Sequence, residues 1–312
     1  MSADDGLPFG FAADFDTPIP YMQRTREYYR AIGYDTPYRW AHYNDAPFQP
    51  LQKPLARARI TIVTTAAPFD PARGDQGPGA KYNGGAKFYQ VYAGDTSAPH
   101  DLRISHIAYD RLHTSAEDSG TWFPLPALLR AAAAGRVGEV AKHFFGAPTN
   151  RSQRVTIETD APEIVARCKA DEVDAAILVP NCPVCHQTVT LVARALETAG
   201  IATVITGCAK DIVEHAGAPR FLFNDFPLGN SAGRPRDPAS QTETLERALQ
   251  VLEAAPGPRT TMQSPLRWSE DPAWKLDYNN IERMPPEELA RRRSEFNAQK
   301  EIARKVRENA TG

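Results

Sequence analysis

Long apolar runs are missing from this chain of 312 residues, and so is a strong excess of either charge. No apolar stretch approaches the roughly 20 residues that a membrane-spanning helix needs. The 36 basic and 38 acidic side chains leave a net charge of −2, with no long basic run. These absences argue against a membrane protein and against a nucleic-acid partner. The first residues also lack the basic start and apolar core of a secretory signal, so we expect a cytoplasmic protein.

Familiar cofactor motifs are missing too. The sequence contains no GxGxxG after a predicted strand, no phosphate loop ending in GKS or GKT, and no GxSxG. The common nucleotide-cofactor classes therefore have no support. Only four cysteines are present, too few for a disulfide framework in a chain of this length, and a cytosolic CxxC is more often catalytic or metal-binding.

Short apolar segments that alternate with amphipathic ones indicate the fold. The pattern predicts strands at 59–65, 102–108, 154–158, 175–179 and 201–207. It predicts helices at 21–32, from about 126 with a short helical piece after Gly135, at 161–172, 183–200 and 240–254, and from about 285. This alternation favours an α/β fold, doubly wound, with a mostly parallel sheet and helices on both faces.

Three parts of the chain differ in composition. Residues 1–56 are rich in proline and aromatic side chains and are expected to form an irregular N-terminal wrapping segment. Residues 57–258 are expected to form the α/β catalytic domain. Residues 259–312 are expected to form a C-terminal extension with a long charged helix.

The stretch NCPVCHQT at 181–188 places two cysteines three residues apart, directly after a predicted buried strand. Ligands of open α/β sheets bind outside the carboxyl ends of the strands. Pro183 favours the first position of a helix and disfavours helical geometry before it, so Cys182 is the expected N-cap. Free N–H groups and the positive helix end would then stabilise a thiolate at Cys182.

Several roles remain open for these thiols. Cys208 follows the next predicted strand, so the topology brings it toward Cys182 and Cys185. CxxCH is also the haem-attachment signature, but that attachment requires export. A structural zinc site needs four ligands, and Cys182, Cys185, Cys208 and His186 are the available set. The remaining interpretations are two space-filling cysteines or a reactive dithiol.

Other polar side chains are expected near the same strand ends. His106 is a candidate acid or base for a thiol reaction, with Asp110 close by in sequence. The candidate substrate-binding residues are hydroxyl, amide, carboxyl and guanidinium side chains near predicted strand ends or in a Gly/Pro-rich loop: Thr64, Thr65, Asn181, Asp110 and Arg220.

Three segments carry a resemblance to a known family. ISHIAYD with AEDSGTWFPLPALLRAAAAGRVG, VDAAILVPNCPVCHQT, and PRFLFNDFPLGNSAGRPRDP resemble the selenoprotein B family of glycine, sarcosine and betaine reductase and of D-proline reductase. The resemblance covers about residues 58–255. It implies that Cys182, in place of selenocysteine, is the nucleophile and Cys185 the resolving thiol. It also implies an external reductant and a second, pyruvoyl-containing subunit.

These observations lead to one main hypothesis and two alternatives. The main hypothesis is a thiol-dependent oxidoreductase that cleaves a C–N or related bond in a small amino-acid-derived or cyclic amide substrate. It needs no bound cofactor but an external dithiol or redox protein. The first alternative is a redox-neutral C–S lyase, desulfhydrase, hydrolase or racemase-like enzyme that uses Cys182 and Cys208. The second is a zinc-binding protein without redox activity. We expect a homo-oligomer with a redox partner or second subunit.

Overall fold

The computed structural model describes residues 12–74, 82–149 and 152–311. None of the helices in this part of the chain is long and apolar enough to cross a membrane.

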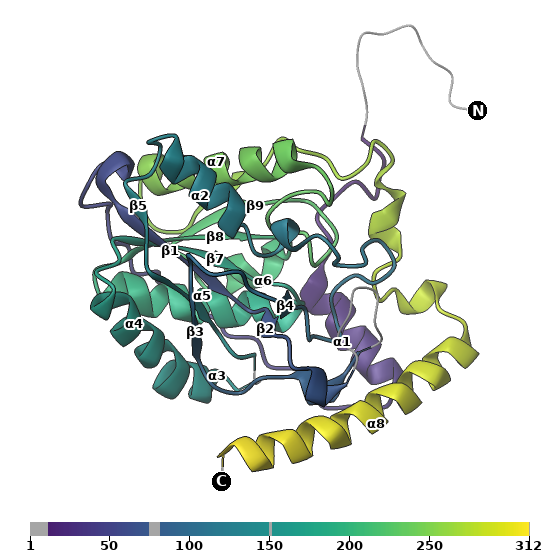
Figure 1. The fold of residues 1–312 in the computed structure, drawn as a ribbon. Coiled ribbons are helices and arrows are strands. Elements are labelled where there is room, and N and C mark those ends of the chain that lie inside the picture. Colours follow the sequence, from purple (N-terminus) through teal and green to yellow (C-terminus); the bar gives the residue numbers. More distant parts are fainter. Residues whose placement is uncertain (1–11, 75–81, 150–151, 312) are drawn as a thin grey trace, which may run out of the picture.

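A mixed, mostly parallel sheet forms the centre of the molecule (Figure 1). Its strands run in the order β10-β9-β8-β7-β1-β6-β3, with β5 beside β1. All pairs are parallel except β3 with β6. The strands are β1 (Arg59–Thr64), β3 (Tyr92–Asp95), β5 (Glu139–Val140), β6 (His143–Gly146), β7 (Ala175–Val179), β8 (Ala202–Gly207), β9 (Arg220–Phe223) and β10 (Thr260–Gln263). A separate antiparallel pair joins β2 (Ala67–Pro68) to β4 (Leu102–Arg103).

Helices cover both faces of the sheet, so the predicted α/β class is confirmed (Figure 1). Successive side chains of a strand point to opposite faces. Accordingly, Ile62 of β1 belongs to the core under α2 (Leu125–Ala133) and α7 (Pro238–Ala254). Val63 belongs to the core under α4 (Ala161–Ala170), α5 (Pro183–Thr198) and α6 (Lys210–His215).

The two ends of the described chain pack together beside the carboxyl ends of the strands. Helix α1 (Tyr21–Ala31) lies against the long helix α8 (Pro286–Thr311), which runs along one side of the molecule (Figure 1). Phe296 of α8 is 5% exposed and packs edge-on against the rings of Tyr29 and Tyr34. Short 3-10 turns occur at Leu55–Arg57, Pro71–Arg73, Gly84–Ala86, Ser119–Thr121, Pro272–Leu276 and Ile281–Arg283.

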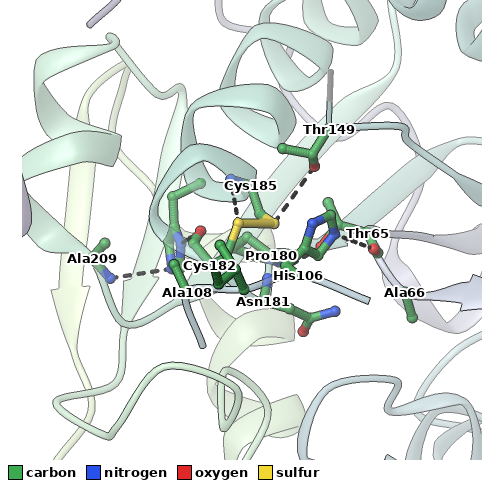
Figure 2. The surroundings of a disulfide bond; sticks show 12 residues. Thr65, Ala66, His106, Ala108, Thr149, Pro180, Asn181, Cys182, Cys185 and Ala209 are labelled. Atoms are coloured by element: carbon green, nitrogen blue, oxygen red, sulfur yellow. Dashed lines mark hydrogen bonds between the residues drawn. A yellow bond between two sulfur atoms is a disulfide. The ribbon is translucent and has the colours of Figure 1, made fainter. Parts of the chain in front are cut away.

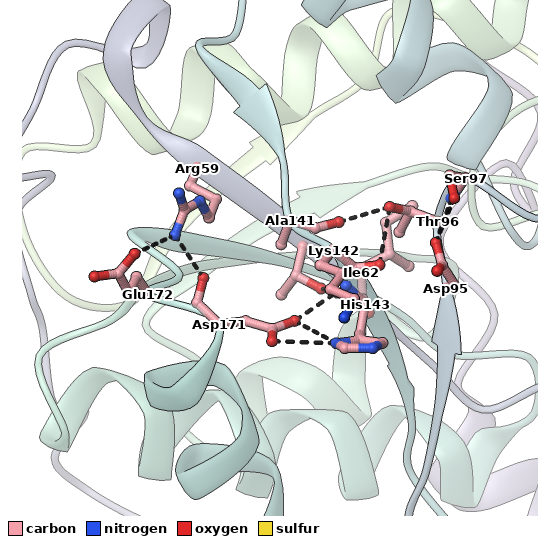
Figure 3. A network of polar contacts seen from close by, with 11 residues as sticks. Arg59, Ile62, Asp95, Thr96, Ser97, Ala141, Lys142, His143, Asp171 and Glu172 are labelled. Carbon is pink, nitrogen blue, oxygen red and sulfur yellow. Dashed lines mark hydrogen bonds and ion pairs between the residues drawn. The ribbon is translucent and has the colours of Figure 1, made fainter.

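Charged side chains pair across the amino-terminal edge of the sheet. Arg59 at the start of β1 pairs with Glu139 at 2.7 Å and Glu172 at 2.8 Å. His143 at the start of β6 contacts Asp171 at 2.8 Å (Figure 3). This edge therefore holds its charges in matched pairs.

Several predicted elements were wrong. Residues 154–158 are helical, within α3 (Gln153–Val155) and a π-helical turn at Thr156–Asp160, because Ser152 caps this segment by accepting from Val155 N. The strand expected at 102–108 ends at Arg103, and the helical piece expected after Gly135 is the β5–β6 segment. β9 and β10 were missed, since both are short and lie among prolines and glycines.

Candidate active site

The site lies where the strand order changes direction. The chain continues from β1 toward β6 on one side and from β7 toward β8 on the other, so a crevice forms between the carboxyl ends of β1 and β7. This switch point is where open α/β sheets bind ligands. Thr65 follows β1 and Cys182 follows β7 closely, so both stand at this crevice.

Cys182 is the N-cap of α5, as the position of Pro183 predicted. Its Sγ accepts a hydrogen bond from the backbone N–H of Cys185 at 3.3 Å. A disulfide joins the two cysteines, whose Cα atoms lie 5.0 Å apart (Figure 2). The cap geometry therefore aims the Cys185 N–H of the first helical turn at the sulfur of Cys182 and keeps Cys185 within bonding reach.

His106 and Thr149 complete the surroundings of the two sulfurs (Figure 2). A ring nitrogen of His106 and the two sulfurs all lie within 4.8 Å of one another. Nε2 of His106 lies 3.0 Å from the carbonyl oxygen of Thr65 and donates to it, since a carbonyl only accepts. The Thr149 hydroxyl donates to Cys185 Sγ at 3.5 Å. The site thus combines two sulfurs, an imidazole and a hydroxyl, all nearly inaccessible to solvent.

A cavity of about 520 Å³ opens onto one of the two sulfur-bearing residues. Cys182 lines it, whereas Cys185 is fully buried and does not. The two cysteines are therefore unequal, because only Cys182 contacts the space that a ligand could fill. The other walls come from α1, the 106–112 segment, residues around Tyr278 and helix α8, including Tyr28, Tyr29, Asp110, Arg111, Tyr278 and Arg292.

His186 is a structural clamp. Its Nδ1 donates to the carbonyl of Cys182 at 2.8 Å, and its Nε2 accepts from the backbone N–H groups of Cys208 and Ala209 at 2.9 and 3.2 Å. Burial lowers the pKa of His186 to about 4, so the ring is neutral. Gly207 makes room for it, because a Cβ there would lie 2.8 Å from Nε2. With both nitrogens engaged, His186 has no ring nitrogen available in this arrangement for the alternative zinc set of Cys182, Cys185, Cys208 and His186.

Cys208 lies apart from the dithiol. It is 2% exposed, and its sulfur contacts the carbonyl of Pro227 and the hydroxyl of Ser231. Burial raises the pKa of the Cys208 thiol to about 12. Because it does not line the cavity, the structure does not pair Cys208 with Cys182 across a ligand, contrary to the racemase-like alternative.

The residues at the ends of β1 and β7 position the site and do not line the cavity. Thr64 accepts from the N–H of Ala66 at 3.1 Å, and Thr65 accepts through Oγ1 from the N–H of Asn181 at 3.1 Å. The Asn181 amide is fully buried and has no hydrogen-bond partner among the described residues. Burying such a group without a partner costs about 1–3 kcal/mol of stability. This unsatisfied amide belongs to the residue directly before Cys182.

The two charged candidates for substrate binding lie in different parts of the structure. Arg220 lies at the start of β9, away from the cavity, where its Nη1 contacts Glu197 at 2.7 Å. It was therefore wrongly assigned to the site. Asp110 does line the cavity and accepts from Nδ1 of His113 at 2.9 Å. This carboxylate raises the pKa of His113.

Sequence reasoning missed Thr149, Arg111 and the wall formed by α8. Thr149 follows β6, and the β6 sequence HFFG carries an apolar run that could have indicated a strand end. No local pattern marks Arg111. The docking of α8 beside Cys182 depends on contacts more than a hundred residues apart in sequence, which spacing does not reveal.

Together the fold and site define an α/β protein with a buried cysteine pair at a helix N-terminus, one member of which lines a cavity at the sheet's switch point. No model of a protein family matches the chain, and no solved structure matches it.

Comparison with curated proteins agrees with the resemblance drawn from the motifs. D-proline reductase subunit gamma of Acetoanaerobium sticklandii is 28% identical over 213 residues, which cover 66% of this chain and 84% of that protein. Glycine reductase complex component B subunit gamma of Peptoclostridium acidaminophilum is 24% identical over 227 residues, 70% of this chain and 51% of the relative. The same subunit of Symbiobacterium thermophilum is 26% identical over 223 residues, 69% of this chain and 50% of the relative. The chain is thus homologous to reductase subunits and spans about half the length of the glycine reductase relatives.

Proposed function

We propose that the protein is a thiol-dependent reductase that cleaves a C–N bond in a small amino-acid-derived or cyclic amide substrate. The observation that carries this proposal is the inequality of the two cysteines: Cys182 lines the cavity, and Cys185 stands behind it within disulfide reach. A nucleophile must meet the substrate, whereas a resolving thiol must meet only the nucleophile. The relatives, which are named as reductase subunits, support the reductive direction.

In the first step the Cys182 thiolate attacks the carbon that carries the substrate nitrogen. A Cys182 Sγ–C bond forms, and the electron pair of the C–N bond leaves with nitrogen. The nitrogen takes a proton, for which His106 is the nearest imidazole. Nε2–H of His106 stays on the Thr65 carbonyl in both charge states, so the proton that moves is the one on Nδ1.

In the second step the Cys185 thiolate attacks Cys182 Sγ. The S–S bond forms while the S–C electron pair returns to carbon, which takes a proton, and a neighbouring carbonyl stabilises the charge that develops there. The substrate gains two electrons and two protons, and the dithiol becomes the Cys182–Cys185 disulfide. An external dithiol then restores both thiols. Because the relatives are subunits of larger reductases, we also propose that a second subunit supplies the substrate or the reductant.

A single-turnover experiment tests this proposal. The reduced protein, freed of reductant, is mixed with D-proline and with larger cyclic amino acids and amides, and thiols, protein mass and released amine are measured. Turnover should consume two thiols. Cys185→Ser should stop at a covalent adduct on Cys182, and Cys168→Ser, which alters a buried thiol remote from the cavity, should behave as the parent. Full turnover by Cys185→Ser without added dithiol would refute the reductive reaction.

One observation favours a second candidate, a metal site. His106, Cys182 and Cys185 can offer three ligand atoms within 4.8 Å of one another when the cysteines are reduced. The Nε2–H bond of His106 to a carbonyl is the type of contact that orients metal-bound imidazoles. Zinc titration of the reduced protein distinguishes the two functions. One tightly held equivalent, lost in His106→Ala, would support the metal site, and no retained zinc would remove it.

A further inference from the structure

A partly buried arginine, Arg111, lines the cavity beside the two cysteines. Nη1 of Arg111 donates to the carbonyl oxygens of His106 at 3.1 Å and Ile107 at 2.6 Å. The guanidinium lies over the ring of Tyr109, 3.9 Å from its centroid. One corner of the group is thus fixed to the same segment that carries His106.

The other edge of this guanidinium is unsatisfied. Nε of Arg111 is buried and has no hydrogen-bond partner in the described part of the chain, whereas Nη1 and the face of the guanidinium make the contacts given above. Burial lowers the pKa of Arg111, and among the described residues it is tyrosine hydroxyls, not carboxylates, that oppose this shift. A cation withdrawn from water without a counter-ion costs free energy, so this arrangement favours an anion that enters from outside the chain.

Several other charged groups of the cavity have partners. Arg291 and Arg292 both contact Glu288 at 2.7 Å. Asp110 accepts from the N–H of Leu112 and from His113. Arg111, in contrast, is a partly buried cation with no acidic side chain within ion-pair distance among the described residues.

We propose that Arg111 binds the carboxylate of the substrate through its Nε–Nη2 edge. That edge presents two parallel N–H groups in the spacing of a carboxylate, the geometry of a bidentate pair. Because Nη1 is held by the backbone of His106 and Ile107, the orientation of the guanidinium is fixed before the ligand arrives. Nε is closed to solvent in this structure, so neighbouring side chains must shift for it to meet the carboxylate. The inference deepens the proposed function, on which its link to Cys182 rests, and it replaces Arg220 as the carboxylate anchor.

The walls of the cavity indicate the rest of the ligand. The volume of about 520 Å³ lies within the range of drug-sized ligands and is far more than proline needs. Tyrosine rings from separate elements surround it: Tyr28 and Tyr29 of α1, Tyr109, and Tyr278. We therefore infer an organic acid larger than proline, with a carboxylate at one end and a ring or acyl group that packs on these rings.

Equilibrium binding to the oxidised protein tests Arg111 without any reaction. The probes are hippurate, a glycine carboxylate with an aromatic acyl group, and its neutral amide, hippuramide. Wild type should bind hippurate at least about 10-fold tighter, and Arg111→Gln should abolish this preference. Arg103→Gln is the matched control: this arginine also stacks on a ring, that of Phe69 at 4.7 Å, but does not line the cavity. An equal affinity for both probes in wild type, or a preference that survives Arg111→Gln, would overturn the proposal.

Loss of folding must be separated from loss of binding. Thermal unfolding of each variant provides that check, because Nη1 also holds the 106–107 backbone. Arg111→Lys keeps the charge and loses the planar edge, so it should weaken hippurate several-fold and leave hippuramide unchanged. If Arg111→Gln does not fold, the same comparison in Arg111→Lys decides, and an undiminished preference there contradicts the bidentate contact.

Alkylation of the reduced protein links Arg111 to Cys182. The ratio of Cys182 modification by iodoacetate to that by iodoacetamide should fall about 10-fold in Arg111→Gln and stay constant in Arg103→Gln. Arg111-dependent hippurate binding with an unreactive Cys182 would refute the proposed function and leave the carboxylate site intact. If Cys182 is reactive but its iodoacetate-to-iodoacetamide ratio is the same in Arg111→Gln and in wild type, the carboxylate site is refuted and the proposed function stands.

Discussion

The two edges of the sheet treat polar groups in opposite ways. At the amino-terminal edge, Arg59 meets Glu139 and Glu172, and the buried Arg220 meets Glu197. At the carboxyl-terminal edge, the Asn181 amide lacks a hydrogen-bond partner and Arg111 lacks a carboxylate in the part of the chain that the structure describes. Both edges are built from the same strands.

The difference separates groups that hold the fold from groups held ready for a ligand. A buried polar group without a partner lowers stability, and we propose that Asn181 and Arg111 are kept for a ligand. Nε of Arg220 also lacks a partner among the described residues, but the charge of that guanidinium is paired with Glu197. The amino-terminal edge should therefore respond to mutation through stability, and the carboxyl-terminal edge through activity. Four predictions, from the largest expected effect to the smallest, test this contrast. His186 is the counter-example at the carboxyl-terminal edge: both of its ring nitrogens have backbone partners, so it should respond through stability.

Cys182→Ala should abolish turnover of any substrate found in the single-turnover experiment, by about a thousand-fold or more, since it removes the proposed nucleophile. In the reduced protein its cost in stability should be small, because without the disulfide the sulfur supplies only a cap contact to the N–H of Cys185. Amine release with dithiothreitol measures the first effect and urea unfolding the second. Appreciable turnover by this variant would contradict the view that the carboxyl-terminal edge responds to mutation through activity.

Glu197→Ala should lower the free energy of unfolding by about 3–5 kcal/mol, because it leaves the buried Arg220 guanidinium unpaired. Both side chains are almost inaccessible, at 0% and 1% exposure. Burial raises the pKa of Glu197 and the Arg220 charge opposes that rise, so the carboxylate depends on its partner. Urea unfolding gives the change, and iodoacetamide labelling of Cys182 in the folded variant should be unaltered. A loss below 1 kcal/mol would contradict this view of the edge.

His186 should make stability depend on pH. Its pKa falls from 6.5 in the unfolded chain to about 4 in the folded one. As pH drops from 6.5 to 4, the unfolded state takes up a proton that the folded state refuses, so stability falls, by about 3 kcal/mol in total. In His186→Gln, where an amide can replace part of the clamp, this portion of the pH dependence should disappear. If the free energy of unfolding falls equally in both proteins as pH drops from 6.5 to 4, His186 is excluded as the cause.

Arg59→Ala should cost less than about 1 kcal/mol, since its partners Glu139 and Glu172 are exposed and surface ion pairs contribute little. Activity and labelling of Cys182 should not change. Thermal unfolding provides the measurement, with Glu197→Ala as the large-effect reference at the same edge. A loss of stability comparable to that of Glu197→Ala would show that the exposure of an ion pair does not determine how much it stabilises the fold.

The sequence was most informative where local rules decide the structure. The apolar run of β7, followed by Pro183 and an amphipathic helix, predicted both the strand and the N-cap at Cys182. It was least informative for short strands such as β9, whose four residues RFLF carry too little pattern between prolines.

Only part of the site could be predicted from the sequence, and the reason is physical. His106 was selected from its chemistry, and the fold brings it to the sulfurs. Arg220 was selected in the same way and is instead neutralised in the core by Glu197, a residue 23 positions away. Sequence spacing does not tell which of two arginines finds an acidic partner in the fold, and Arg111 is the one that does not.

The cavity has two origins. The sulfurs and the imidazole come from the segments that the reductase-like motifs span, whereas Tyr28 and Arg292 come from the helices near the two chain ends. The proposed chemistry and the proposed selectivity thus belong to separable stretches of the gene. A lineage could exchange the terminal helices and acquire a new range of substrates while it kept the same thiol reaction.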